Sequence, residues 1–492
     1  MAITFSQVSS SAAASQVFVE QENVQRVSGS PVIPHKVLVP GQYNSGKSPT
    51  DNVPQLILNK EDAWDRYGRG SMLSNMIEKI FDAGGIFEVY ALPLADDESA
   101  TVADGSIAFS GTATAVGTVA TYINGVRVTT AVAVDDEASD VATAVAASIN
   151  ANLDLPVTAS AETGTVTVTA RWGGESGNQI TLELSRRDTD SLPDGVTATV
   201  TDIGDGTAGA TDPTIDTALD NIGDTWYTEI AFPYLSTDAL TAIKNFGDDR
   251  ADAGVKRPFI AFAGYTDTAS AFITELDSHN SQWLSFIGVH GGPSAAFEIA
   301  AATAGVWARV QNSTPGRPAK TERLPGIFAG DSNDLTYSTQ NSIFTAGGST
   351  TRNTVGGGIT LIDVATTRTE TDAGAETDDW RYATIIPNLQ FKIYSLENTF
   401  LASPFDQAVV LADGGGPGPT YGVRPSTVKS YAVGLIDDWV ERGLSTNRDS
   451  IIENTSAEIN SSNPGRIDLV IGDIATAPLN IVAVKLEWSY IS

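Results

Sequence analysis

The chain has 492 residues, enough for roughly three domains, and its 41 % hydrophobic content with 45 glycines and 22 prolines is typical of a globular, turn-rich protein. Its net charge of −31 argues against wrapping nucleic acid, because such binding neutralises phosphates with Lys and Arg. The absence of cysteine excludes disulfides, thiolate nucleophiles and cysteine-bound metals. No run of about 18 apolar residues predicts a membrane span, and no basic-then-apolar start predicts a signal peptide.

Residues 1–30 are interpreted as an N-terminal arm. Ile3, Phe5, Val17 and Val19 lie in a Ser- and Ala-rich stretch with too few apolar residues to form a core. We therefore expect this arm to supply strands that are used between subunits.

The middle of the chain predicts a discontinuous α/β domain, residues 31–95 and 208–311. Asn59 can cap one helix and Ser236 another, because their side chains accept hydrogen bonds from helix amides. Strand and helix patterns alternate beyond Pro213, which favours a parallel sheet covered on both faces. Strands are expected at 35–39, 86–92, 225–232, 259–263 and 283–289, and helices at 59–67, from 71 to 83, and near 236–247, 267–280 and 293–311.

Residues 96–207 predict an inserted β-rich module. Two alternating runs flank Asn124-Gly125, the dipeptide that a type I′ hairpin turn prefers. One amphipathic helix follows, carrying Val141, Val145 and Ile149, and further strands are expected after it. An acidic, glycine-rich segment from Asp202 is the expected linker out of the module.

Residues 312–462 are assigned to a C-terminal domain. Its first part, to residue 379, is rich in Gly, Thr and Asn and predicts loops with a short strand at 358–364. Long helices are expected at about 387–402 and 426–442, with Gly443 closing the second.

Residues 463–492 form the C-terminal strand arm in this interpretation. Two runs alternate with period two and predict two strands, the second beginning at Pro478. The apolar positions are Ile467, Leu469 and Ile471 in the first run and Val482, Val484, Leu486 and Trp488 in the second. A terminal strand with an apolar face must join a sheet, either in its own chain or in another molecule.

One motif raises an enzymatic alternative. Residues 41–48, GQYNSGKS, match the phosphate-binding pattern G-x-x-x-x-G-K-[ST] after a short strand. A true site needs a helix that begins at Lys47-Ser48, but Pro49 and Pro54 and the lack of apolar periodicity disfavour one. We interpret the stretch as a surface turn.

Other chemical signals are weaker. No G-x-S-x-G elbow predicts a serine hydrolase, and His35, His279 and His290 are too scattered for a zinc motif. The sequence therefore predicts no catalytic, cofactor-binding or metal-binding residue.

Taken together, the order of several short stretches resembles the tail sheath proteins of contractile-tailed bacteriophages, specifically the Mu-like branch. The similar stretches are VLVPGQ at 37–42, DAWDRYGRGSML at 62–73, VYALPL at 89–94, YING at 122–125, Gly177-Asn178, DTWYTEIAFPY at 224–234, TTR at 366–368, NLQF at 388–391, YGVRP at 421–425 and NPGR at 463–466. The N-terminal arm departs from the pattern, because Ala14-Ser15-Gln16 stands where many relatives have a Pro-Gly turn.

This resemblance implies a fold and a role. It implies an α+β multidomain chain, with α/β sheet core domains, an inserted β-rich module and terminal strand arms. It also implies a non-enzymatic subunit without cofactors that polymerises as stacked hexameric rings around a tail tube and contracts to drive the tube through the host envelope.

The resemblance further implies partners. Arms of one subunit would complete a C-terminal sheet of its neighbours, and the sheath would meet the tail tube protein, the baseplate and the tail terminator. The C-terminal domain would face the tube, with Arg424, Lys429 and Arg442 supplying positive charge, while the 96–207 module points outward. The expected location is the virion tail, assembled in the host cytoplasm.

Two other classes of function stay open at this point. The first is a nucleotide-dependent enzyme that uses Gly46, Lys47 and Ser48. The second is a β-rich adhesin or lattice protein built on the 96–207 module. The sheath subunit is the function that we expect.

Overall fold

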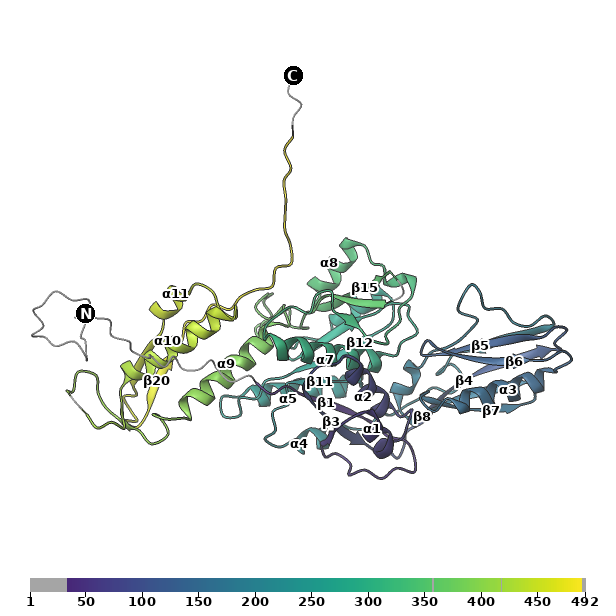
Figure 1. Ribbon diagram of the computed structural model, residues 1–492, viewed down its shortest axis with the longest axis horizontal. Coiled ribbons are helices and arrows are strands. Elements are labelled where there is room, and N and C mark those ends of the chain that lie inside the picture. Colours follow the sequence, from purple (N-terminus) through teal and green to yellow (C-terminus); the bar gives the residue numbers. More distant parts are fainter. Residues whose placement is uncertain (1–32, 356–357, 417, 489–492) are drawn as a thin grey trace, which may run out of the picture. The chain divides into compact units, whose positions relative to one another are not determined.

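A computed structural model (Figure 1) describes residues 33–355, 358–416 and 418–488 of the chain. Its described part divides into two compact units. The large unit comprises residues 33–394 and 475–488, and the small unit comprises residues 395–474. The predicted arm positions Ile3, Phe5, Val17 and Val19 lie outside the described residues.

The core of the large unit is a nine-stranded mixed sheet with the order β14-β16-β15-β13-β12-β11-β1-β3-β2. Neighbouring strands are parallel from β15 through β3, and antiparallel strands lie at both ends. The bounds are β1 Lys36–Gln42, β2 Gln55–Ile57, β3 Glu88–Leu94, β11 Glu229–Ala231, β12 Ile260–Tyr265, β13 Leu284–Gly288, β14 Arg323–Leu324, β15 Gly348–Thr354 and β16 Gly358–Asp363. The central strands are buried along almost their whole length, as expected for a sheet covered on both faces. The predicted α/β sheet core is confirmed.

Helices cover this sheet, and α7 is the most deeply buried of them. It packs against β12 so closely that a Cβ on Gly264 would lie 2.2 Å from the Ala296 carbonyl oxygen. The predicted caps are confirmed, because Asn59 Oδ1 accepts from the Asp62 amide and Ser236 Oγ from the Ala239 amide. The helices are α1 Lys60–Tyr67, α2 Met72–Asp82, α4 Asp216–Asp220, α5 Thr237–Ala251, α6 Ala269–Leu276, α7 Ala296–Ser313 and α8 Tyr337–Thr345, with a 3-10 turn at Asp331–Asn333.

Residues 96–207 build two small antiparallel sheets around the helix α3, with strand orders β10-β4-β8-β7 and β6-β5-β9. The bounds are β4 Val102–Gly111, β5 Gly117–Ile123, β6 Val126–Val132, α3 Ala138–Ala151, β7 Val157–Glu162, β8 Thr165–Gly173, a 3-10 helix Glu175–Gln179, β9 Leu182–Leu184 and β10 Val196–Thr201. Asn124 and Gly125 both have positive φ in the β5–β6 turn, which confirms the predicted hairpin.

The module is fastened to the large sheet and its helices. Gln42 Nε2 donates to the Gly173 carbonyl, Thr181 Oγ1 donates to the Pro293 carbonyl, and the Trp172 ring lies edge-on to Phe297. Because these contacts come from β8 and from Thr181 just before β9, and reach both β1 and α7, the module and the sheet form one continuous packed body.

The edge strand β7 is blocked by a side chain. The Asn150 amide of α3 donates to the carbonyl of Ala159 at 2.7 Å and accepts from its N–H at 2.9 Å. The amide therefore occupies backbone groups that an added strand would need.

The small unit begins within α9, a continuous helix over Ile385–Phe400. Trp439 of α10 is buried, and its Nε1 donates to Ser395 Oγ at 3.0 Å. The remaining elements are β17 Val409–Val410, β18 Gly422–Val423, α10 Pro425–Glu441, α11 Arg448–Glu453, β19 Ser456–Ile459 and β20 Ile467–Val470. Both predicted long helices are confirmed to within two residues.

The stretch assigned from sequence to one C-terminal domain, 312–462, falls in both units. Strands β14, β15 and β16 belong to the nine-stranded sheet, whereas residues from 395 onward belong to the small unit.

No helix among the described residues has both the length and the hydropathy needed to cross a bilayer.

Candidate inter-subunit interface

The GQYNSGKS stretch at 41–48 lacks the geometry of a phosphate-binding loop. Strand β1 continues through Gly41 to Gln42, and the next helix begins only at Lys60. The Lys47 amide closes a turn on the Asn44 carbonyl at 3.2 Å, while Lys47 Nζ donates to the Asp65 carbonyl at 2.7 Å. No helix N-terminus is therefore present at Lys47 to face an anion.

Nucleotides are accordingly expected to leave the melting temperature of the chain unchanged to within about 1 °C. A nucleotide present at a hundred times its Kd would stabilise the folded state by about 2.7 kcal/mol, which is easily detected. The measurement is thermal unfolding with ATP or GTP plus Mg²⁺, with the Lys47→Ala variant as control. A shift of several degrees in the wild type that Lys47→Ala removes would contradict this interpretation.

The three histidines lie apart and have ordinary structural partners. His35, which directly precedes β1, pairs through Nδ1 with Glu229 Oε1 of β11 at 2.8 Å, and His279 pairs with Glu275 one helical turn away. Burial lowers the pKa of His290, whose Nδ1 lies 2.5 Å from the Asp267 carbonyl oxygen. Within the described ranges, no group of three or more His, Asp or Glu side chains is arranged to hold a metal ion.

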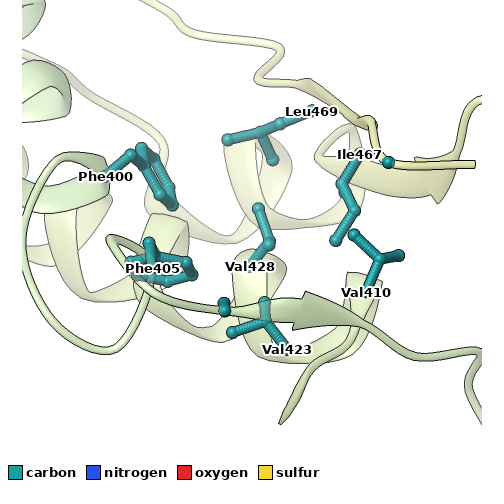
Figure 2. A pocket seen from close by; sticks show the side chains of 9 residues that line it. Phe400, Phe405, Val410, Val423, Val428, Ile467 and Leu469 are labelled. Atoms are coloured by element: carbon teal, nitrogen blue, oxygen red, sulfur yellow. The ribbon is translucent and has the colours of Figure 1, made fainter. Parts of the chain in front are cut away.

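The small unit contains an apolar groove of about 380 Å³. Figure 2 shows Phe400 and Phe405 at one end of the view, Ile467 and Val410 at the other, and Val428 between them. The two phenylalanine rings meet edge-on with centroids 4.9 Å apart. The lining residues are Phe400, Phe405, Ala408, Val410, Val423, Val428, Gly465, Ile467 and Leu469. The lining side chains are all apolar, which suits an apolar side chain, and the polar atoms that the groove exposes belong to the backbone.

The strand β20 forms one wall of this apolar groove. It pairs antiparallel with β19 in a two-stranded sheet, with Ile459 opposite Ile467 and Ser456 opposite Val470. Among the described residues neither strand has a second strand partner, so each has one open edge. A two-stranded sheet alone is marginally stable, and an added strand would complete it.

The hairpin that presents β20 is fixed by side chains. Asn460 Nδ2 donates to Asp468 Oδ2 at 2.7 Å, and Arg466 pairs with the same carboxylate. These hydrogen bonds, from Asn460 first and then from Arg466, hold the pKa of Asp468 below its usual value. The Arg466–Asp468 ion pair therefore lies at the start of β20, whereas Ile467 and Leu469 line the apolar groove.

We call residues 475–488 the distal arm. Residues 481–488 are all exposed, with no helix or strand assigned to them. Val482, Val484, Leu486 and Trp488 are each 71–83 % exposed although their spacing places them on one face of an extended chain. Burying such side chains is worth about 1.5–3 kcal/mol each, so this exposed apolar face is a candidate docking surface.

The two apolar runs predicted to form inter-subunit strands therefore lie in different structural environments. Ile467 and Leu469 are half-buried in β20, which has one partner in its own chain, and Ile471 follows that strand. The second run has no strand partner over 481–487 among the described residues. Sequence reasoning missed the groove residues Phe400, Phe405 and Val428, and their only signal was a Phe pair that flanks Ser403-Pro404.

The predicted tube-facing cations already have partners in two of three cases. The Arg424 guanidinium donates to the carbonyls of Ala412 and Gly416, and Arg442 Nε lies 3.0 Å from both carboxylate oxygens of Asp438. Lys429 is half-buried on α10 and, in the part of the chain that the structure describes, forms no ion pair.

Comparison with known proteins gives one full-length sequence relative. The chain is 26 % identical to the Mu-like prophage FluMu tail sheath protein of Haemophilus influenzae over 497 residues, covering 99 % of this chain and 100 % of the relative. No family model matches the chain.

A sheath tail protein from Desulfitobacterium hafniense matches with a TM-score of 0.48 at 11 % identity, covering 94 % of this chain and 100 % of that one. The anti-feeding prophage helical sheath in its contracted state matches with a TM-score of 0.47 at 13 % identity, covering 97 % and 99 %.

Proposed function

The chain is a full-length homologue of a Mu-like prophage tail sheath protein, and we propose that it is the structural subunit of a contractile tail sheath. In this role it polymerises around a tail tube and shortens to drive the tube through the host envelope. It is a structural protein and not an enzyme. The observation that carries the proposal, beside the homology, is the exposed apolar face of the distal arm.

Subunits are linked by strand exchange in this proposal. The distal arm of one copy adds to the open edge of β20 in a second copy and places Val482, Val484 and Leu486 toward the apolar groove. The unpaired edge and the apolar lining next to it support this arrangement. Strand addition supplies backbone hydrogen bonds and the groove supplies burial, which together give affinity and register. Residues 1–20 of the N-terminal arm act as a second link.

Such links suit a polymer that changes shape. Backbone ladders in a small sheet survive when subunits pivot, whereas side-chain contacts between the larger bodies can be exchanged for others in the contracted state. The energy of contraction is then the difference between two packings of the same chain.

The remaining assignments follow the sheath role. The subunits stack as hexameric rings, and the tail tube, baseplate and tail terminator proteins are the other partners. The small unit faces the tube with Lys429 as its available cation, and Arg424 and Arg442 contribute less because intramolecular partners already bind them. The 96–207 module points outward. The sheath is part of a virion tail and assembles in the host cytoplasm.

Purified full-length protein is expected to form hollow tubes in negative-stain electron microscopy. The enzymatic alternative predicts soluble monomers with ATPase activity, and the geometry of residues 41–48 does not favour it. An adhesin built on the module predicts sheet-like or receptor-bound forms. Monomers that stay dispersed at every protein and salt concentration would overturn the sheath proposal.

A further inference from the structure

Residues 478–480, which we call the root of the distal arm, pack on the rest of the large unit, whereas residues 481–488 are exposed. Pro478 and Asn480 are half-buried, whereas Leu479 between them directs its side chain to solvent and is 75 % exposed. Pro478 and Asn480 border a cavity of about 10 Å³ together with Trp307 from α7 and Val364. This alternation shows that one face of the root rests on the protein before the chain leaves it.

Lys320 holds the root through a charge-assisted hydrogen bond. Its Nζ donates to the Leu479 carbonyl at 3.2 Å and pairs with Asp363 Oδ1 at 3.1 Å. Asp363 is the last residue of β16, and the neighbouring Thr321 amide donates to the Leu361 carbonyl at 2.8 Å. Lys320 therefore connects the root directly to β16, the second strand from one end of the nine-stranded sheet.

One hydrogen-bond donor and one hydrogen-bond acceptor without partners among the described residues belong to side chains that line the same cavity. Trp307 Nε1 and Asn480 Oδ1 are buried, and within the described residues neither has a hydrogen-bond partner. An indole N–H can only donate and an amide Oδ1 can only accept, so the two groups are complementary. Both groups line one cavity, so holding Asn480 there keeps this complementary donor and acceptor together.

We propose that Lys320, Trp307 and Asn480 form a clasp that fixes the root of the distal arm to the large unit, with the exposed part of the arm beginning at Ile481. The clasp rests on the proposed function, because it matters only if the distal arm binds a second copy. Tension on a bound arm then passes into α7 and β16 of the large unit. Without the clasp it would pass through residues 471–477 into the β19–β20 hairpin of the small unit. Lys320 is a positioning residue: it sets where the arm departs.

The test measures the spread of arm positions in dispersed full-length chains by double electron–electron resonance. The protein has no cysteine, so Ala483→Cys on the arm and Ser338→Cys on α8 give two unique spin-label sites. Lys320→Met, which keeps the aliphatic stem but removes the donor, is expected to widen the distance distribution at least twofold. Trp307→Phe is expected to widen it less. Lys320→Arg should keep the wild-type width because it still donates.

A matched control and a second readout separate the possible failures. Lys485→Met removes a lysine beyond the clasp and should leave the distribution unchanged. Lys320→Met should also raise the protein concentration needed for tubes by about 3- to 10-fold, because a loose arm loses more freedom on docking. An unchanged distribution in folded Lys320→Met protein overturns the clasp. A distribution that responds in a protein that never forms tubes supports the clasp and overturns the sheath function.

Discussion

Truncation after Asn480 is expected to abolish tube formation and leave a folded chain. Residues 481–488 are exposed, so their removal takes little from the packed body and the melting temperature should stay within about 1 °C of wild type. The truncated chain keeps the clasp and the β19–β20 sheet, and it lacks only the segment that would enter a second copy. Pelleting by ultracentrifugation and negative-stain microscopy measure the loss. Removal of residues 1–16 is expected to have the same effect on assembly.

Single substitutions on the distal arm test which face of the strand is buried on assembly. Val484→Asp places a carboxylate on the face that would be buried, and it should cost about 3 kcal/mol or more per contact, which is a loss of at least about a hundredfold in affinity. Ala483→Asp adds the same charge on the opposite face and should assemble nearly normally. Equal loss in the two variants would contradict a strand with one buried face, and tubes that persist after truncation would contradict strand exchange altogether.

A mixture of two assembly-defective chains is expected to form a complex of one copy each and no tubes. Ala408→Trp fills the apolar groove but keeps the distal arm, whereas truncation after Asn480 keeps the groove but removes the arm. Each pair then has one usable distal arm and one compatible groove, so this contact cannot be repeated along a polymer. Because a donor site and an acceptor site differ, this interface is heterologous and repeats only when every chain carries both.

Mass photometry of the mixture, and of each chain alone, measures the outcome. Gln407→Trp is the matched control, since Gln407 is exposed and does not line the groove; this chain should still form tubes. Tubes in the mixture would show that the groove is not the acceptor. The absence of any complex, with both chains folded, would show that the two sites do not bind each other.

The strongly patterned parts of the fold could be predicted from the sequence. The caps at Asn59 and Ser236 and the turn at Asn124-Gly125 follow from local hydrogen bonding and from positive φ, which neighbouring residues decide. The exposed apolar face of the arm could also be predicted, because period-two alternation needs no tertiary contact to be visible.

Tertiary contacts explain what could not be predicted. Strand β15 has the sequence GSTTRNT and no apolar run, yet its first four residues are buried. Its hydroxyl groups satisfy the core instead: Ser349 Oγ lies 3.1 Å from Ser285 Oγ, and Thr351 Oγ1 donates to the Gly288 carbonyl at 2.7 Å. The predicted strand at 225–232 shortens to β11, where buried Glu229 is paired with His35 from a distant segment. Likewise, the groove is assembled from segments between Phe400 and Leu469 whose spacing carries no period.

The blocked edge of β7 limits unwanted pairing between chains that have not yet assembled. Asn150 closes that edge with its own amide, and the net charge of −31 keeps the outer surfaces of separate molecules apart. Newly made chains can therefore accumulate to high concentration without pairing edge to edge through β7. Pairing through β7 is thereby excluded, which leaves the terminal arms and the surfaces that receive them to determine which chains join.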